Sequence, residues 1–435
     1  MRFALKFATL AGACFLMSCS LYKDVSVTPL LLMPGDIAMR GVAVPEMVEA
    51  GEFARAAAQA ARIDEKENPS PRDLAALGRA ELACGRLDAA RRHLRAALDL
   101  KPFHADIGDI GWSISQTEYL ANNFAAAYDW AKFAEDHGLS LKQWHLDYLK
   151  ALSNVQINRI SWPAPVRVPL NIGNPDVPRI DVDVNDLERT SGVIDSGAVL
   201  TIVSQSFAKR AEIRPLGDFR GTFYGLLGEP IEVRFGMIDG LKIGDLLVEN
   251  VPVAIMPDEK LSFFVSKRQP FKMDLLVGVN LLKEFRLEFD YPQEMVTLTP
   301  LTTKDRNPAP DQNLFFVGFR PFVYGTINRK GWYLFVLDTG SEVTFLNEGQ
   351  LGMTNIRGLP RFHGATLQGL GGAQKRGAKV ENVQIGVDRW AGDFRTLPLY
   401  GNEQSNSIGI LGENFLQNFR VVIDFGTMRM ELHRK

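Results

Sequence analysis

Two aspartates, Asp195 and Asp338, lie in short strings of the same pattern, VIDSGA and VLDTGS. In each string two apolar residues precede Asp, then Ser or Thr, then Gly and a small residue. Carboxyl groups can act as general acids and bases, so two repeated aspartates are candidates for that chemistry. A single Asp-Ser/Thr-Gly triplet is also ordinary turn chemistry, because Asp side chains bond to the backbone two residues on. The context of the two strings decides between these interpretations.

The two strings belong to a longer internal repeat. Asp195 and Asp338 are 143 positions apart, and four further landmarks recur after them in the same order. These landmarks are a Gly-bearing stretch at Gly225 and Gly369, an Ile-Gly pair at Ile243 and Ile385, an apolar run ending at Gly278 and Gly412, and a later aspartate at Asp290 and Asp424. Five ordered landmarks indicate a duplicated unit. We interpret the last pair of aspartates, which end strand-like segments, as structural.

Each repeated unit is expected to be all-β. The segments around the landmarks are short runs of Val, Ile, Leu and Phe, broken by Gly, Pro, Asn and Asp. Residues 180–184 alternate in polarity, and Asn185-Asp186 follows as a predicted hairpin turn. Residues 328–331 occupy the same place in the second unit. Each repeated aspartate is therefore expected after a hairpin and a buried strand, at the mouth of the next turn.

These two units resemble retropepsin-type aspartic protease domains, fused in one chain as in the two-lobed pepsin-like arrangement. The resemblance covers roughly residues 165–435. It rests on three motifs that occur twice: the Asp-Ser/Thr-Gly turn, a Gly-bearing flap, and an apolar-apolar-Gly strand at residues 276–278 and 410–412. The resemblance implies two all-β barrel lobes, with each lobe giving one aspartate to a shared site.

The predicted boundaries place lobe 1 at residues 165–300 and lobe 2 at residues 314–435. Residues 301–313 between them are polar and contain prolines, which indicates an extended linker. Such a linker is long enough for the two lobes to face each other within one chain. An exchange of lobes between two chains is the alternative, and the sequence leaves it open.

The resemblance implies that Asp195 and Asp338 form a catalytic pair. Two carboxyl groups about 3 Å apart cannot both ionise, so such a pair shares one proton. The ionised member would activate a water that attacks a peptide carbonyl, and the protonated member would donate to the developing oxyanion. This chemistry requires no metal or other cofactor. Because the titration belongs to the pair, the sequence leaves open which aspartate holds the proton.

Residues around the pair receive roles from the same resemblance. Ser196 and Thr339 are expected to brace the two loops through hydroxyl hydrogen bonds. Gly197 and Gly340 are expected to allow a tight turn and a close backbone approach that a Cβ would obstruct. The predicted flap and substrate-binding residues are Tyr224, Gly225, Gln368, Gly369 and Gly371. Lobe 2 fits the family pattern more closely, because two leucines follow Gly225 where a Gly-rich flap tip is usual.

The N-terminal segment predicts export and lipid anchoring. Arg2 and Lys6 flank the start of an apolar stretch that is too short for a convincing membrane span, which is typical of a signal peptide. The tetrad LMSC resembles a bacterial lipobox, which implies a signal peptide of residues 1–18 and acylation of Cys19. Ser20 then favours outer-membrane delivery, facing the periplasm. An ordinary signal peptide that is cut nearby is the alternative.

A helical module is predicted between a tether, residues 19–45, and lobe 1. Residues 46–155 are rich in Ala, Leu, Arg and Glu at helical spacing, and residues 77–102 resemble a tetratricopeptide repeat. Gly51 and Gly85 begin similar strings 34 positions apart, which is the period of that repeat. Two uses stay open: a concave surface that binds a peptide or protein partner, or a spacer between the membrane and the lobes.

Composition and charge argue against several function classes. With 49 Lys and Arg against 51 Asp and Glu, the formal net charge is −2, which gives no electrostatic case for nucleic-acid binding. The six His are scattered without metal-ligand spacing, and no Gly-x-Ser-x-Gly elbow of a serine hydrolase is present. Of the three Cys, processing and acylation would leave only Cys84, so no internal disulfide is expected.

These observations predict a lipid-anchored, periplasm-facing aspartic endopeptidase that acts on a peptide or protein substrate. The alternative is a non-catalytic lipoprotein scaffold, which would use the helical repeats and a peptide groove between the lobes. The two hypotheses differ at the aspartate pair, because hydrolysis requires both carboxyl groups and a scaffold does not.

Overall fold

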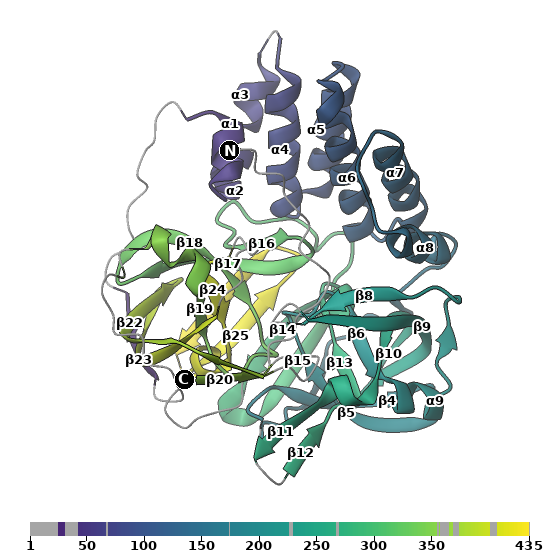
Figure 1. The fold of residues 1–435 in the computed structure, drawn as a ribbon, viewed down its shortest axis with the longest axis vertical. Coiled ribbons are helices and arrows are strands. Elements are labelled where there is room, and N and C mark those ends of the chain that lie inside the picture. The colour runs from purple at the N-terminus through teal and green to yellow at the C-terminus, as the bar shows by residue number, and fades with distance from the viewer. Residues whose placement is uncertain are drawn as a thin grey trace.

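The computed structural model has helices in its N-terminal part and two β lobes after them (Figure 1). It describes residues 25–30, 42–66, 68–173, 175–225, 229–266, 269–354, 356, 365–368, 374–400 and 407–434. Cys19 and the predicted flap residues Gly369 and Gly371 lie outside the described residues. Within the described part of the chain, no helix is long and apolar enough to cross a membrane.

The N-terminal helices pack against one another, and the first three pack on the fourth. They are α1 (Val44–Glu49), α2 (Phe53–Ala57), α3 (Ala60–Asp64), α4 (Pro71–Ala83), α5 (Leu87–Asp99), α6 (His104–Leu120), α7 (Phe124–Asp136) and α8 (Gln143–Leu152). Ser70 caps α4 by accepting a hydrogen bond from the backbone N–H of Asp73 at 3.0 Å. Gly85 takes a positive φ of 70° in the turn after α4. The helical prediction is confirmed, and the tetratricopeptide assignment stays a prediction.

Lobe 1 is built on a nine-stranded sheet. The elements from the end of the helices to the linker are β2 (Arg159–Ile160), β3 (Val166–Pro169), β4 (Arg179–Val184), β5 (Glu188–Ile194), β6 (Thr201–Ser204), α9 (Gln205–Arg210), β7 (Arg214–Pro215), β8 (Gly221–Tyr224), β9 (Pro230–Ile243), β10 (Leu246–Met256), β11 (Ser262–Ser266), β12 (Gln269–Lys272), β13 (Leu275–Val277), α10 (Val279–Leu282), β14 (Phe285–Asp290) and β15 (Met295–Pro300). The sheet order is β2-β10-β6-β13-β5-β4-β9-β7, with β8 paired to β9.

Lobe 2 repeats this plan on an eight-stranded sheet. Its elements are β16 (Leu314–Val317), β17 (Arg320–Ile327), β18 (Lys330–Leu337), β19 (Phe345–Asn347), β20 (Ala365–Gln368), β21 (Gln374–Gly377), β22 (Lys379–Val387), β23 (Trp390–Tyr400), β24 (Gly409–Leu411), α11 (Glu413–Leu416), β25 (Phe419–Asp424) and β26 (Arg429–Arg434). Strand β1 (Val25–Pro29) pairs antiparallel with β23 at the edge of this sheet. A segment expected to be part of a tether therefore belongs to lobe 2.

The hairpins before the two repeated aspartates form as predicted. Asn185 and Asp186 have φ values of 54° and 55° between β4 and β5, and Asn328 and Arg329 have 51° and 60° between β17 and β18. Two successive positive φ angles are the geometry of a type I′ turn, which suits the twist of paired strands.

One predicted landmark correspondence is wrong. Gly244 has a φ of 57° in the turn between β9 and β10, whereas Gly386 lies inside β22. The equivalent turn of lobe 2 is at Asp388, which has a φ of 53°. The two Ile-Gly pairs therefore occupy different places in their lobes. Asp388 follows Gly244 by 144 positions, the same offset as that between Gly225 and Gly369.

A five-stranded sheet joins the two lobes of one chain, in the order β26-β25-β14-β15-β3. Strand β14 of lobe 1 and β25 of lobe 2 pair antiparallel, with Asp290 opposite Arg420 and Arg286 opposite Asp424. Asp290 accepts a hydrogen bond from the backbone of Gln293, and Asp424 caps the turn after β25 in the same way. Both aspartates thus cap turns in the sheet that fixes one lobe to the other.

The helical module contacts both lobes (Figure 1). Against lobe 2, the phenol of Tyr324 accepts a hydrogen bond from the backbone N–H of Phe53 at 3.0 Å. Against lobe 1, the ring of Trp144 in α8 stacks on Phe235 of β9 with centroids 5.7 Å apart. The helices are therefore packed onto the lobes along two separate contacts.

Candidate active site

Each repeated aspartate directly follows a strand. That strand pairs with a second strand, the crossing strand, which contains the apolar-apolar residues of the apolar-apolar-Gly motif. Strand β13 runs parallel to β5, and the backbone N–H of Asp195 donates to the carbonyl of Val277 at 3.0 Å. In lobe 2, β24 runs parallel to β18, and the N–H of Asp338 donates to the carbonyl of Leu411 at 3.1 Å. The apolar-apolar-Gly strands found in the sequence therefore hold the two aspartates by their backbone.

The two carboxyl groups are fully buried and are oriented by backbone amides. Asp195 Oδ1 accepts from the N–H groups of Gly197 at 2.8 Å and Ala198 at 3.0 Å. Asp338 Oδ1 accepts from the N–H of Gly340 at 3.0 Å. No backbone amide or hydroxyl of the described residues donates to the Oδ2 atoms, and the two carboxyl groups hydrogen-bond to each other. Each carboxyl group thus has one oxygen held by its own loop and one oxygen that its loop does not hold.

The glycines of the two loops let the carboxyl groups face each other. A Cβ added at Gly197 would lie 2.3 Å from Cγ of Asp338, and one added at Gly340 would lie 2.3 Å from Cγ of Asp195. No side chain fits at such a distance, so the glycine backbone of each loop lies directly against the opposite carboxyl group. The structure thus brings together two residues that are 143 positions apart in the chain.

Ser196 and Thr339 bind the two loops to each other by exchanged hydrogen bonds. The Thr339 hydroxyl donates to the carbonyl of Ile194 at 2.7 Å and accepts from the N–H of Ser196 at 3.1 Å. In return, the Ser196 hydroxyl donates to the carbonyl of Leu337 at 2.7 Å and accepts from the N–H of Thr339 at 3.1 Å. Four bonds across the lobe boundary fix the separation of the two aspartates.

Burial disfavours the charged form of both aspartates. Burial raises the pKa of Asp195 to about 6, although two backbone amides and the neighbouring Asp338 oppose the shift. Burial also raises the pKa of Asp338 well above its usual range, and the nearby charge of Asp195 adds to this shift. Asp195 accepts more hydrogen bonds from backbone N–H groups than Asp338 does, and such bonds favour the charged form of a carboxyl group.

A second layer of polar residues supports the crossing strands, and the sequence analysis missed it. Asn280 Oδ1 accepts from the N–H and the hydroxyl of Thr201, at 2.7 and 2.9 Å. Asn414 Oδ1 accepts from the N–H of Thr344 at 2.7 Å in lobe 2. These residues recur at the offsets of the repeat, 143 for the threonines and 134 for the asparagines. That recurrence was the signal that could have identified them.

We define the flap of lobe 1 as β8, Gly225, Glu229 and the start of β9, where residues 221–224 pair with residues 230–233. Tyr224 is opposite Pro230, and the N–H of Gly225 donates to the carbonyl of Glu229 at 2.9 Å. In lobe 2, Gln368 of β20 is opposite Gln374 of β21 in a two-stranded ribbon. The two hairpins occupy equivalent places in the repeat, 144 positions apart.

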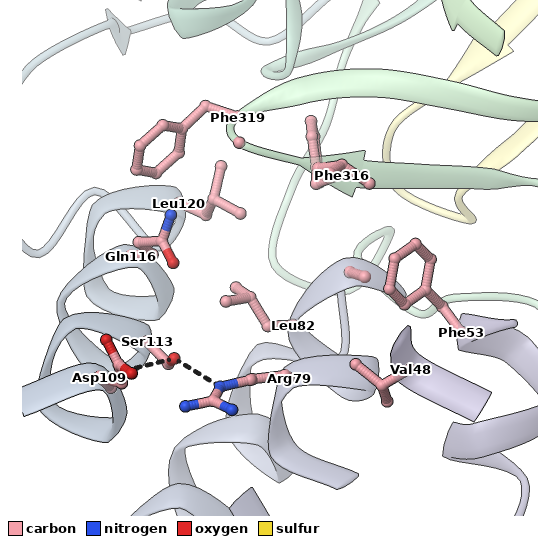
Figure 2. A pocket seen from close by; sticks show the side chains of 13 residues that line it. Val48, Phe53, Arg79, Leu82, Asp109, Ser113, Gln116, Leu120, Phe316 and Phe319 are labelled. Atoms are coloured by element: carbon pink, nitrogen blue, oxygen red, sulfur yellow. Dashed lines mark hydrogen bonds between the residues drawn. The ribbon is translucent and has the colours of Figure 1, made fainter. Parts of the chain in front are cut away.

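A separate cavity of about 100 Å³ lies between the helical module and lobe 2 (Figure 2). Arg79 of α4 and Ser113 of α6 form its polar side, where the Arg79 Nε donates to the Ser113 hydroxyl at 3.2 Å. Phe316 of β16 and Phe319 of the turn between β16 and β17 close it from lobe 2. None of the site residues predicted from the sequence lines this cavity.

The described residues contain no group of three or more His, Cys, Asp or Glu side chains placed to hold a metal ion. The polar groups at the site are the two carboxyl groups, the two hydroxyls and the amides of their loops. This set of groups can bind and move protons, and it can hydrogen-bond to a water or a carbonyl oxygen.

Comparison with known proteins gives a family match for part of the chain. Residues 180–281 match the family described as aspartyl protease. A solved structure of a retropepsin-like aspartic protease from Rickettsia conorii is 14% identical, with a TM-score of 0.22, and the likeness covers 33% of this chain and 96% of that chain. No curated protein matches the chain. Residues 180–281, which include Asp195 and the strand that crosses behind it, are therefore similar to aspartyl proteases.

Proposed function

We propose that the protein is an aspartic endopeptidase in which Asp195 and Asp338 activate a water. One observation carries the proposal: two fully buried carboxyl groups face each other across loops that only glycine permits. The aspartyl protease match over residues 180–281 supports a protease. A purely structural pair of buried acids is a poor alternative, because burial and the nearby charge of Asp195 disfavour the ionised form of Asp338 and so cost stability.

The two aspartates differ in their backbone hydrogen bonds, and we use this difference to assign one as the general base and the other as the general acid. Asp195, which accepts two backbone hydrogen bonds, takes a proton from the water. The water oxygen attacks the peptide carbonyl carbon in this step. Asp338 gives its proton to the carbonyl oxygen in the same step, which forms a neutral tetrahedral diol. The proton now on Asp195 passes to the leaving nitrogen as the C–N bond breaks. Asp338 recovers a proton from the diol, so the pair returns to its starting state.

The test of this proposal uses the full-length protein in detergent with a diverse peptide library between pH 3 and 8. Mass spectrometry identifies cleaved bonds, and Asp338→Asn serves as the inactive comparison, because it removes the proton donor and changes little in shape. Internal cleavage that is lost in the variant supports the endopeptidase. Absence of cleavage by the wild-type protein over the whole pH range would contradict it and favour the scaffold hypothesis.

We further propose that the protein is lipid-anchored at Cys19, facing the periplasm at the outer membrane. The lipobox-like tetrad supports this, and strand β1 begins only six positions after Cys19. An anchored protein would therefore hold lobe 2 close to the bilayer, since residues 20–24 can span about 20 Å at most. Cys19→Ala should move the protein from the membrane fraction to the soluble fraction, while retention in the membrane fraction would contradict lipid anchoring.

A second candidate function is partner binding by the helical module. The cavity between α4, α6 and lobe 2 favours it, because it offers a guanidinium and an amide beside apolar walls, as a peptide side chain and its backbone require. Leu82→Trp would fill this cavity at a distance from the aspartate pair. A peptide array should bind the wild-type protein better than the variant, and equal binding to both would contradict this function.

A further inference from the structure

Helix α8 lies directly behind the flap of lobe 1. Trp144 and Tyr148 are one turn apart on one face of α8, and both rings contact Phe235 of β9, with centroids 5.7 and 5.0 Å away. The Trp144 ring also lies 6.0 Å from that of Phe223 in β8. An aromatic layer from the helical module thus covers both strands of the flap on one side.

The flap depends on this layer because its backbone hydrogen bonds join only two strands. Within the described part of the protein, β8 pairs with β9 alone, through residues 221–224 and 230–233. A single two-stranded hairpin is only marginally stable without a packed face. Phe223 and Ile231 supply that face and are each 1% exposed. The packing surface that they meet is contributed in part by Trp144.

The side chains of β8 alternate between the packed face and the opposite face of the flap. Successive side chains of a strand point to opposite sides, so Tyr224 lies on the face away from Phe223 and Trp144. Tyr224 is the last residue of β8 and directly precedes Gly225. A shift of Phe223 on the helix side therefore moves Tyr224 on the other side.

Gly221 allows the close contact between helix and flap. A Cβ at this position would lie 2.8 Å from the ring of Phe235 and 3.2 Å from the indole of Trp144. The backbone of β8 is thus in contact with both rings at the point where the flap leaves lobe 1. The helix, the glycine and the two flap strands form one packed unit.

We propose that Trp144 is a positioning residue for the flap of lobe 1, so that the helical module is part of the apparatus that holds a substrate. This inference rests on the proposed endopeptidase function. It assigns to the helices a role that neither a spacer nor a separate partner-binding module would have. The flap of lobe 1 is fixed from behind, and substrate binding uses a Tyr224 position that α8 sets.

The test compares Trp144→Leu, Trp144→Phe and Trp130→Leu with the wild-type protein, each as the full chain. Leucine keeps the helix and part of the apolar contact, whereas phenylalanine keeps a ring. Trp130 is the matched control, because it packs in α7 against Phe133 and under Arg95, away from lobe 1. Unchanged amide exchange within α8 verifies that the helix remains folded in each variant.

The first readout is hydrogen exchange of the flap amides, which does not depend on activity. Trp144→Leu should speed exchange in β8 by about tenfold or more, because local opening becomes easier when packing is lost. Trp144→Phe and Trp130→Leu should stay close to the wild-type protein. Flap exchange in Trp144→Leu that equals the wild-type rate would overturn the inference.

The second readout is the kinetics of peptide cleavage. Trp144→Leu should lower kcat/KM by about tenfold, mainly through a higher KM. A misplaced flap should weaken binding of the substrate and of the transition state by the same factor. Trp144→Phe should restore most of this loss. A fall in kcat with unchanged KM would contradict a role in flap position. If the wild-type protein cleaves no peptide, the endopeptidase proposal fails, while the exchange experiment still decides whether α8 supports the flap.

Discussion

At the scale of single residues, Asp195 and Asp338 occupy equivalent places but have unequal surroundings. Two backbone N–H groups bond to Asp195 and one bonds to Asp338, because Ala198 of lobe 1 adds a donor to the loop. Hydrogen bonds to the charged form favour ionisation. The fold is duplicated, yet the two members differ in their hydrogen bonds, and the proposed acid–base mechanism uses this difference.

The raised pKa values predict where hydrolysis depends on pH. The proposed mechanism requires ionised Asp195, whose pKa burial raises to about 6, and protonated Asp338, whose pKa is raised further. As pH rises, kcat/KM should therefore increase through about pH 6 and fall only when Asp338 ionises. A profile of kcat/KM against pH measures both limbs. An activity optimum below pH 4 would contradict the raised pKa values of Asp195 and Asp338.

The exchanged hydroxyl bonds predict a specific loss of stability. Thr339→Ala leaves the buried N–H of Ser196 and the buried carbonyl of Ile194 without these partners. Each unpaired group costs about 1–3 kcal/mol, so the free energy of unfolding should fall accordingly in a urea titration. Thr339→Ser keeps the hydroxyl and should retain most of the stability. Equal losses in both variants would show that the methyl group, not the hydroxyl, matters.

The residues at the pair could be identified from the sequence because they lie in a short motif that recurs with fixed spacing. Asp195 and Ser196 stand beside each other in the chain, as do Asp338 and Thr339, so a local pattern reveals them. Thr201 and Asn280 were missed because they are 79 positions apart and are common residue types. The catalytic roles of Asp195 and Asp338 in hydrolysis stay predictions.

At the scale of elements, the crossing strands decide where each aspartate sits. Gly278 and Gly412 follow these strands, and each meets the backbone of its own lobe. A Cβ at Gly278 would lie 2.4 Å from the carbonyl carbon and oxygen of Leu200. A Cβ at Gly412 would lie 2.6 Å from the carbonyl oxygen of Val343. The apolar-apolar-Gly pattern thus has a steric cause in both lobes.

Gly278→Ala is therefore expected to destabilise lobe 1. Backbone atoms cannot turn aside as a flexible side chain can, so the clash should cost about 1–3 kcal/mol or more. Gly352→Ala is the matched control, because an added Cβ there meets nothing within 4 Å. Thermal unfolding followed by circular dichroism measures both variants. Equal midpoints for Gly278→Ala and the control would contradict the proposed close crossing.

The strands and turns could be predicted where local chemistry is sufficient. The hairpin at Asn185 and Asp186 follows from residues that tolerate positive φ between alternating strands. The correspondence of Gly244 with Gly386 was wrong because a short Ile-Gly string does not define a turn. Pairing shows that the turn of lobe 2 lies at Asp388, two positions later than the string suggested.

At the scale of the whole molecule, a buried charged cluster connects the helices, lobe 1 and the linker. Glu284 Oε1 accepts from Asn122 of the turn after α6 at 2.8 Å and from Lys283 Nζ at 2.6 Å. Arg306 of the linker binds the other oxygen of Glu284. Burial disfavours the charge of Glu284, yet Lys283 and Arg306 together hold its pKa below the ordinary value.

Removal of the central carboxylate should loosen this junction. Glu284→Gln leaves the buried ammonium of Lys283 without its counter-charge, which typically costs about 3–5 kcal/mol. The midpoint of urea unfolding should shift to lower concentration, whereas exposed Glu259→Gln should leave it unchanged. A wild-type midpoint in Glu284→Gln would show that the cluster does not hold the parts together.

The arrangement of helices and lobes could not be derived from the sequence, because it depends on contacts between distant segments. Phe53 and Tyr324 are 271 positions apart, and Trp144 and Phe235 meet only after both domains have folded. Strand β1 was equally hidden, since a five-residue strand at a sheet edge carries little periodic signal. The duplicated β lobes could be predicted because each repeats the same short-range pattern.

The most direct test of the central claim is a comparison of kcat/KM for Asp195→Asn, Asp338→Asn and the double variant on one cleaved peptide. Groups that act as one unit are non-additive, so each single variant should lose about 10²–10⁴-fold and the double variant scarcely more. Circular dichroism verifies folding. Substantial activity in either single variant, or losses that multiply in the double variant, would contradict a proton shared between Asp195 and Asp338.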